Sequence, residues 1–565
     1  MTHTFSRASG LLHTCIGYET AGPQRAVFRG AAPDAMPPGT EWFLIDRDGR
    51  ECRRGRLEPR GALWGASWWV ADFSGCRTPG EYAVELRPPG AAPRRGEPFA
   101  VGDDILWRGT WRAVGLDQLE RRRALAPGGL GWQDCGSMVH KPASTLREAM
   151  SHAAMVIGLT DALEFRSDGL DADERRAVAG AALHGCAYLA ACQDLGAELG
   201  LGDGALAHEI DRFRYAIPGE MPKCAVAFAR AARLACGADG ARRRDLLDRA
   251  ARALDWHRAR RIVVRTEVHP RALGAPEDFA PPEDPMTCDL LMEAWGAWEL
   301  AKAGAAGEAE HAARAVERVL SRQVAPDAPD QGFHGHFRTF DAGPVTEKAW
   351  SHHGFGFNCG AVFPHYLLPV VEMCRADPGV PGRARWREAL RRFAYGYFLP
   401  ACDASPFHLL PNGVFPGEGL LHFSGLGHGM NAAYAWAAAL ALEFERFFED
   451  AAFRRIATGN LQWIAGLNAG LTREALAGAW HFRAEVPEGV ALPCSMIRGI
   501  GRRWGGGWLD IPGSICNGFD ADKQFKFDLP PRRETDGPNL FTDEDWITHA
   551  GAWLSALSRL RRAGG

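Results

Sequence analysis

Residues 128–137 read GGLGWQDCGS, and residues 539–557 read NLFTDEDWITHAGAWLSAL. The first stretch places Asp134 after an aromatic–glycine turn, and the second places Glu544 where a helix is expected to begin. Most of the chain between these stretches carries apolar residues at helical spacing. Two carboxyl groups so far apart in sequence can share a site only in a closed fold, so we expect the helices to form a closed ring.

Residues 1–103 have a different character and predict a β-sandwich. Short runs rich in β-branched and aromatic residues are divided by turns such as Pro37-Pro38-Gly39 and Thr78-Pro79-Gly80. Their regular spacing is typical of two packed antiparallel sheets. The expected strands lie at 24–28, 41–45, 67–70, 81–86 and 98–102.

Residues 104–565 are predicted to be all-α. Apolar residues recur there at helical spacing, and alanine is abundant, as in closely packed helices. The number of predicted helices fits a double ring of six hairpins, an (α/α)6 toroid. The expected helices lie at 106–123, 146–165, 173–193, 221–236, 242–260, 288–303, 308–322, 385–398, 427–450, 451–467 and 543–560.

The composition limits the classes of function. A chain of 565 residues is long enough for two domains, and its net charge of −4 gives no general attraction to nucleic acid or to an anionic membrane. No segment reaches the roughly 20 apolar residues of a membrane span, and the first residues lack the apolar run of a signal peptide. We therefore expect a cytoplasmic protein whose 14 cysteines are thiols rather than disulfides. The sequence gives no indication of the oligomeric state.

The layout and several motifs resemble glycoside hydrolase family 9, in the members that carry an N-terminal immunoglobulin-like domain. Residues 67–86, SWWVADFSGCRTPGEYAVEL, resemble a characteristic segment of that domain. Residues 129–137, GLGWQDCGS, are similar to the family's W-x-D-A-G-D turn, and residues 459–470, GNLQWIAGLNAG, to the helix before its G-x-N-P turn. Residues 541–557 resemble the closing helix, in which a Glu is the general acid.

The resemblance implies an immunoglobulin-like β-sandwich followed by an (α/α)6 toroid. It also implies inverting hydrolysis of β-linked oligosaccharides of gluco or glucosamino configuration. It assigns Glu544 as the general acid and leaves Asp134 as the general base, because Ser137 stands where the family has its usual base. His140 is an alternative base, since an imidazole can accept a proton.

Further side chains are candidates for binding the substrate. Aromatic faces stack on sugar rings, and polar side chains hydrogen-bond hydroxyl groups. Residues 493–501, PCSMIRGIG, stand where the family has a P-H-x-R segment and keep the Arg without the His. The predicted substrate-binding residues are Trp132, Ser137, His140, His352, His353, His428, Asn431 and Arg498.

The two catalytic candidates also have structural interpretations. Thr542 followed by Asp545 is typical of a helix N-cap, which would place Glu544 in a capped helix terminus. Asp134 is also typical of an Asx-turn. A cap and a catalytic role are compatible, because a cap fixes the position of the acid. We expect the charges of Asp543 and Asp545 to raise the pKa of Glu544.

No cofactor or metal is predicted. Adjacent residues rarely bind one ion together, so a metal site at His352 and His353 is disfavoured. Asp520 and Asp522 leave a structural calcium ion as an alternative, although the stretch lacks a twelve-residue loop closed by a Glu.

The residues leave two other functions open. A polysaccharide lyase of the same toroid class would use a Tyr/His or Lys/Arg set to remove a proton, and the chain offers only 8 Tyr. A carbohydrate-binding relative with weakened catalysis would explain Ser137 at the position of the usual base. A cytoplasmic hydrolase would meet short imported oligosaccharides, which favours exo-action over cleavage of an insoluble polymer.

Overall fold

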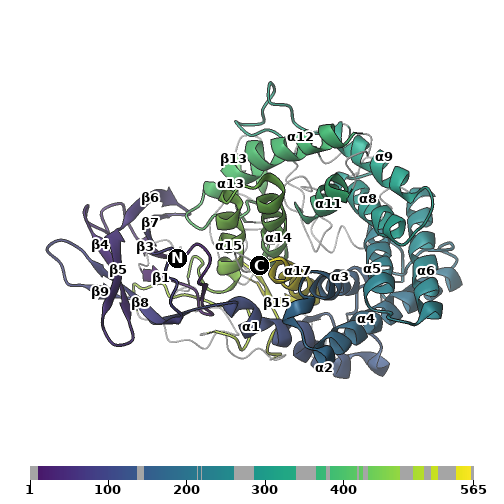
Figure 1. Cartoon of the computed structure of the whole chain (residues 1–565), viewed down its shortest axis with the longest axis horizontal. Helices are drawn as coiled ribbons and strands as arrows, with labels where there is room; N and C mark the ends of the chain where they lie inside the picture. The colour runs from purple at the N-terminus through teal and green to yellow at the C-terminus, as the bar shows by residue number, and fades with distance from the viewer. Residues whose placement is uncertain are drawn as a thin grey trace.

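The computed structural model of the chain consists of a β-sandwich and a ring of helices (Figure 1). It describes residues 10–136, 146–212, 214–217, 219–259, 285–338, 341, 364–376, 382–415, 419–423, 430–470, 488–501, 511–519 and 542–560. For Thr542, Asp543 and Glu544 the backbone alone is described. The strands of the sandwich end at Gly102, and the first helix begins at Ile105.

The N-terminal domain contains two sheets that enclose an aromatic core. The strands are β1 Gly10–Leu12, β2 Tyr18–Glu19, β3 Arg25–Gly30, β4 Glu41–Asp46, β5 Glu51–Arg56, β6 Glu58–Leu63, β7 Ala66–Asp72, β8 Gly80–Arg87, β9 Arg94–Arg95 and β10 Phe99–Gly102. One sheet has the order β1-β3-β7-β6, and the other has the order β2-β10-β8-β4-β5 with β9 paired to β8. The rings of Tyr18, Phe73 and Phe99 pack with centroids 5.0 to 5.3 Å apart.

The predicted β-sandwich is confirmed, with strands at all five expected segments. Strands β5 and β6 are additional. Their sequences, ECRRGR and EPRGAL, are exposed along nearly their whole length, so they carry no apolar alternation from which a strand is predicted.

Six helices close into an inner ring within the part of the chain that the structure describes. They are α3 Ala149–Phe165, α5 Glu220–Leu234, α8 Thr287–Lys302, α11 Leu368–Ala376, α14 Asn431–Phe448 and α17 Ile547–Arg559. Each packs on the next, and α17 packs back on α3 (Figure 1). The ring is therefore closed by the last helix of the chain.

A second layer of helices surrounds the inner ring. Its members are α1 Ile105–Arg112, η2 Ala113–Asp117, α2 Gln118–Leu125, α4 Ala172–Glu198, α6 Gly240–Ala259, α9 Glu308–Leu320, α12 Arg383–Phe393 and α15 Ala452–Ile464. In chain order α4, α6, α9, α12 and α15 each pack on the inner helix before them, whereas α1 and η2 pack on α17. The predicted (α/α)6 toroid is confirmed.

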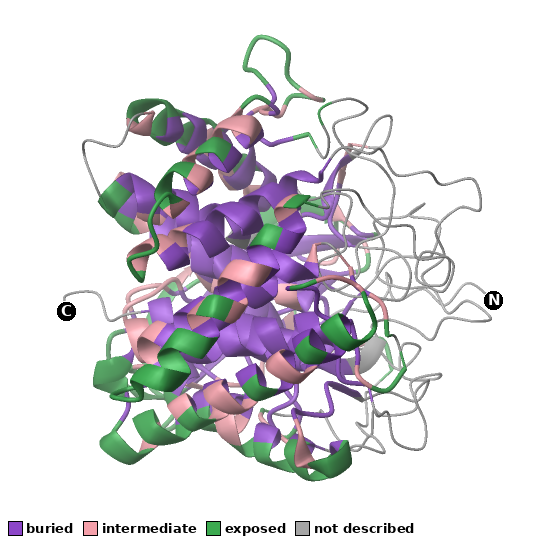
Figure 2. Ribbon diagram, turned by 90° about the vertical axis from the view of Figure 1, so that its right-hand side faces the viewer, coloured by how far each residue is buried: buried purple, intermediate pink, exposed green. Residues whose placement is uncertain are grey.

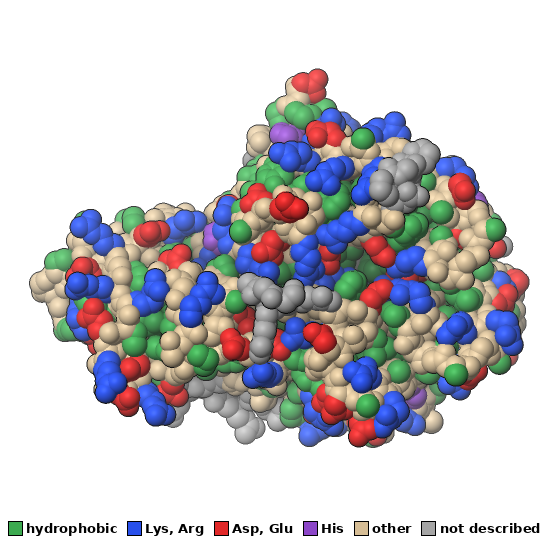
Figure 3. Space-filling model, viewed as in Figure 1, with side chains coloured by type: hydrophobic (Ala, Val, Ile, Leu, Met, Phe, Trp, Pro, Cys, Tyr) green, Lys and Arg blue, Asp and Glu red, His purple; other side chains and the backbone are tan. Residues whose placement is uncertain are grey.

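Burial follows the two layers. Figure 2 shows buried residues concentrated on the inner elements and exposed residues on the outer helices. Helix α17, for example, is buried at all of its positions, whereas α6 keeps an exposed polar face. On the face seen in Figure 3, acidic and basic side chains are interspersed, as the small net charge suggests.

The last helix begins later than predicted. The expected helix 543–560 starts at Ile547, and residues Thr542–Trp546 form strand β15. This strand lies between β11 (Cys135–Gly136) and β14 (Cys516–Gly518) in a three-stranded sheet. The predicted N-cap at Thr542 is therefore wrong. Taken alone, the sequence Thr542–Asp545 is typical of a helix terminus. In the structure, strands β11 and β14 bind the backbone of this segment, so it forms a strand instead.

Two glycines allow the backbones of α17 and α3 to lie in direct contact. A Cβ atom added at Gly551 would lie 2.3 Å from the carbonyl oxygen of Ala154, and one added at Gly158 would lie 2.2 Å from that of Gly551. Any side chain at either position would push the helices apart. This close approach holds α17, which directly follows strand β15, against α3.

The sandwich is fastened to the toroid by an aromatic anchor. Trp64, in the turn between β6 and β7, stacks on Phe407 with centroids 5.9 Å apart and also contacts Phe423 and Trp463. Arg25 donates to the carbonyl oxygen of Phe407 at 2.7 Å. Buried aromatic contacts of this kind hold two domains in a fixed relation.

Candidate functional site

A short ladder joins the two acidic motifs that stand at opposite ends of the toroid sequence. Between β11 and β15, Cys135 lies opposite Trp546 and Gly136 opposite Asp545. The N–H of Ile547 also donates to the carbonyl oxygen of Asp134 at 2.9 Å. Asp134 directly precedes β11, and Glu544 is in the middle of β15. Closure of the ring thus places both backbone segments in one sheet.

The Asp134 side chain is fully buried and only partly bonded. Its Oδ2 accepts a hydrogen bond from the backbone N–H of Glu148, while Oδ1 has no partner among the described residues. Burial raises the pKa of Asp134 well above its usual value, and the nearby carboxyl groups of Glu148 and Glu209 raise it further. These surroundings favour the protonated form of the Asp134 carboxyl group.

A second carboxyl group is held beside Asp134 at the amino end of α3. The Oε1 of Glu209 accepts from the backbone N–H of Arg147 at 2.9 Å, and its Oε2 has no partner within the described part of the chain. Burial and the charge of Glu148 raise the pKa of Glu209 to about 7. Sequence reasoning missed Glu209, because no motif marks it.

A buried histidine, His208, lies between the carboxylates of Glu148 and Glu220. The Nδ1 of His208 is 2.7 Å from Glu220 Oε1, and its Nε2 is 3.6 Å from Glu148 Oε1. Although burial opposes the charge, Glu220 and Glu148 raise the pKa of His208 well above its usual value. His208 is therefore an imidazolium that balances part of the negative charge around it.

Asp545, the neighbour of Glu544, has the opposite surroundings. Its Oδ1 forms a buried ion pair with Arg122, and its Oδ2 is 3.2 Å from Nη1 of Arg498. The hydroxyl of Ser514 donates to the same Oδ2 at 3.3 Å. Two guanidinium groups thus oppose the charge that we expected Asp545 to exert on Glu544. Through Asp545, Arg498 is bound to strand β15, which also contains Glu544.

Two other predicted substrate-binding residues lie buried near this sheet. The Trp132 ring stacks on His152 with centroids 5.2 Å apart, and its exposure is 2%. A sugar could reach that ring face only if His152 moved. The Nδ2 of Asn431 donates to the carbonyl oxygen of Cys516 in β14 at 2.8 Å. Asn431 is fully buried, so it supports the sheet from the start of α14.

The remaining predictions fall outside the described residues. They concern the alternative base His140, the substrate-binding candidates, and the pair considered for calcium. These positions are Ser137, His140, His352, His353, His428, Asp520 and Asp522. Within the residues that the structure describes, no group of three metal-binding side chains is placed to hold an ion.

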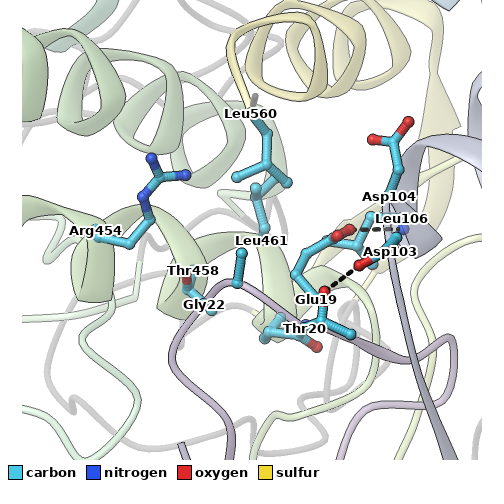
Figure 4. Close-up of a pocket in the computed structure, with 12 residues that line it drawn as sticks. Glu19, Thr20, Gly22, Asp103, Asp104, Leu106, Arg454, Thr458, Leu461 and Leu560 are labelled. Carbon is cyan, nitrogen blue, oxygen red and sulfur yellow. Dashed lines mark hydrogen bonds between the residues drawn. The ribbon is translucent and has the colours of Figure 1, made fainter. Parts of the chain in front are cut away.

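A separate cavity of about 140 Å³ lies where the sandwich meets the toroid (Figure 4). In its wall, Glu19 Oε1 accepts from the N–H of Leu106 at 3.0 Å, and Thr20 hydrogen-bonds Asp103. These bonds fasten β2 to the start of α1. Arg454, Thr458 and Leu461 of α15 form the facing wall. We interpret the cavity as part of the domain joint.

None of the helices described in this structure has the length and apolarity needed to span a lipid bilayer.

Comparison with known proteins supports the fold of both domains. Residues 15–90 match the family described as "Cellulase N-terminal ig-like domain". A metagenome-derived glycoside hydrolase family 9 endoglucanase is similar in structure, with a TM-score of 0.62, 16% identity, and coverage of 97% of this chain and 98% of that one. A Bacteroides ovatus GH9 protein has a TM-score of 0.60 and 14% identity, with 98% of each chain covered.

A third solved structure is AaCel9A in complex with cellobiose-like isofagomine. It has a TM-score of 0.58 and 14% identity, and it covers 98% of this chain and 99% of that one. The comparison with curated proteins found no match. At this level of identity the likeness establishes the fold. The architecture of an immunoglobulin-like domain followed by an (α/α)6 toroid, as in family 9 endoglucanases, is therefore confirmed.

Proposed function

We propose that this chain is an inverting glycoside hydrolase that cleaves β-linked oligosaccharides of gluco or glucosamino configuration. Glu544 is the general acid and Asp134 the general base in this proposal. The β11–β15 ladder is the observation that carries it, because it brings the segments of both carboxyl groups into one sheet. Similar folds in family 9 endoglucanases, and a cellobiose-like ligand on one of them, support the choice of substrate class.

The chemistry needs one protonated and one ionised carboxyl group. Glu544 gives its proton to the glycosidic oxygen as the bond to the anomeric carbon breaks. Asp134 takes a proton from a water molecule, whose oxygen attacks the anomeric carbon from the opposite face. Inverting enzymes hold the two carboxyl groups roughly 6.5–9.5 Å apart to leave room for this water.

The surrounding residues serve this division of roles. Asp134 is positioned by the N–H of Glu148 and by its own backbone bonds, and its unbonded Oδ1 is the atom that would accept the proton. Arg122 and Arg498 fix strand β15 through Asp545, which keeps the backbone of Glu544 in place. Exo-action on short oligosaccharides and a cytoplasmic location remain parts of the proposal.

A panel of β-linked oligosaccharides tests the proposal against its alternatives. New reducing ends, lost in Glu544→Gln and in Asp134→Ala, support the hydrolase. An unsaturated product would indicate a lyase, and binding without turnover would indicate a carbohydrate-binding relative. Ser137→Asp sharpens the test, because it should raise activity in a weakened hydrolase and lower it if Asp134 already works as the base.

A further inference from the structure

Two buried carboxyl groups are bound by consecutive backbone amides at the amino end of α3. The N–H of Arg147 donates to Glu209 Oε1, and the N–H of Glu148 donates to Asp134 Oδ2. Residues 147 and 148 directly precede the first turn of this 17-residue helix. Free amides at a helix start and the helix dipole both favour negative charge, so the site holds two acids side by side.

Each of these acids keeps one oxygen atom without a hydrogen bond. Asp134 Oδ1 and Glu209 Oε2 are buried and have no partner among the described residues. Asp134 is fully buried, and Glu209 is 1% exposed. Neither forms an ion pair with a described side chain, in contrast to Asp545. A buried polar atom without a partner is costly unless a proton or a ligand uses it.

The charged side chains around Asp134 and Glu209 form their ion pairs with other residues. Arg122 is bound to Asp545, and His208 lies between Glu148 and Glu220. Arg147 directs its guanidinium group to Asp211. The titratable or charged groups that act on the pair are Arg122 of α2, Glu148 before α3, Tyr188 of α4, and His208, Arg212 and Tyr215 of the segment before α5.

We propose that Glu209 is a positioning residue for Asp134: consecutive backbone amides hold the two carboxyl groups as neighbours, and the charge of Glu209 helps to decide when Asp134 can accept a proton from water. The role of Asp134 as base rests on the proposed function, whereas the coupling of the two carboxyl groups does not. Two neighbouring buried carboxyl groups cannot both be ionised easily, so they lose their protons in two separate steps that belong to the pair.

In this arrangement Glu209 supplies the second carboxyl group that the sequence lacks at Ser137. The group comes from the segment before α5, not from the turn that carries Asp134. No step requires an oxidant, since each carboxyl group only gains or loses a proton.

The first experiment follows the carboxyl groups directly, without substrate. The pH titration of full-length protein with ¹³C-labelled Asp and Glu carboxyl groups should show two coupled steps, one of them near pH 7, as the pKa of Glu209 is raised to about 7. Glu209→Gln and Asp134→Asn should each leave one step, below the higher step of the unsubstituted protein. Asp203→Asn, which removes an exposed carboxylate from the same segment, should keep both steps. A higher step unchanged by Glu209→Gln would overturn the proposal.

The second experiment uses the reaction. If Asp134 must be ionised to act, Glu209→Gln should move the acidic limb of kcat/KM to lower pH. A shift of one pH unit raises kcat/KM about tenfold on that limb. Glu209→Asp should restore part of the original profile, and Asp203→Asn should leave it unchanged. If the acidic limb of kcat/KM does not move although the carboxyl titration shifts, Asp134 is not the base, and the coupling of the two carboxyl groups is retained.

If Glu209→Gln does not fold, the titration of Asp134→Asn decides alone. A step that persists at the higher position in that variant would show that the pair is not coupled, which overturns the proposal.

Discussion

The two ends of helix α3 treat buried acids in opposite ways. At its carboxyl end, Asp161 accepts from Arg230 at 2.5 Å and from Arg559 at 2.6 Å. At its amino end, Asp134 and Glu209 have no bonded guanidinium group among the described residues. The toroid therefore has the means to compensate a buried carboxylate, as it also does at Asp545 in β15, but Asp134 and Glu209 receive no such ion pair from the described residues.

The same difference appears in the acidity of two glutamates. Although burial opposes it, Arg230, Lys302 and Arg233 lower the pKa of Glu164 to about 2. Burial and Glu148 raise the pKa of Glu209 to about 7. Strongly perturbed acids without a compensating cation are typical of sites that move protons. The charged network at one end of α3 supports the fold, while the acids at the other end are available for chemistry.

The largest expected effect comes from removing the proposed acid. Glu544→Gln removes the transferable proton with little change in shape, so turnover of a natural glycoside should fall by about 10²–10⁴. Thermal stability should stay near that of the unsubstituted chain, and Asp543→Asn serves as the neighbouring control. Full activity of Glu544→Gln in a reducing-end assay would reject the assignment of the acid.

Removing a cation that pairs with the buried acids at the carboxyl end of α3 should lower the stability of the fold and leave catalysis intact. Arg230→Met leaves Asp161 and Glu299 with fewer cations in a buried place, which should cost roughly 3–5 kcal/mol of unfolding free energy. The kcat of the folded fraction should be retained. Arg252→Met, at an exposed pair with Asp203, should cost less than about 1 kcal/mol. Urea unfolding measures both, and equal losses would contradict the comparison.

At the uncompensated end, removing a charge should stabilise the protein at high pH. Because the pKa of Glu209 is raised to about 7 from 4.5, its favourable contribution is complete below pH 4.5 and is lost as the pH rises through 7. Glu209→Gln should therefore gain stability relative to the unsubstituted chain as the pH rises, by roughly 3 kcal/mol above pH 7. Unfolding at pH 4 and pH 8 tests the sign, with Asp203→Asn as the control. A variant that is less stable at pH 8 would contradict it.

The smallest expected effect concerns the helix contact that connects fold and site. Gly551→Ala places a Cβ atom against the backbone of α3 and should cost roughly 1–3 kcal/mol. Since α17 carries β15 at its start, activity should also fall. Gly180→Ala, on α4 where an added Cβ meets nothing within 4 Å, is the matched control. A Gly551→Ala variant with unchanged stability would show that α17 and α3 can separate freely.

The sequence predicted the parts of the fold that carry a local signal. Strands β3, β4, β7, β8 and β10 follow apolar and aromatic runs, and most helices follow a helical period. Strand β15 was predicted as part of a helix, because Thr542 and the acids after it are typical of a helix start and its partner strands come from distant segments.

The candidate site was predictable only where a motif marks it. Asp134 and Glu544 were identified through the two acidic stretches and the family resemblance. Glu209 and Glu148 carry no motif, and their place beside Asp134 depends on how the segment before α5 meets the start of α3. Likewise, the pairing of Arg122 with Asp545 exists only because the ring closes between α2 and α17.

The stereochemistry of the first product tests the central claim most directly. When a β-linked oligosaccharide is hydrolysed in an NMR tube, the anomeric proton signals show which anomer forms before mutarotation. The α-anomer should appear first, because water activated by Asp134 attacks opposite to the bond protonated by Glu544. Initial formation of the β-anomer would rule out hydrolysis with inversion by these two residues.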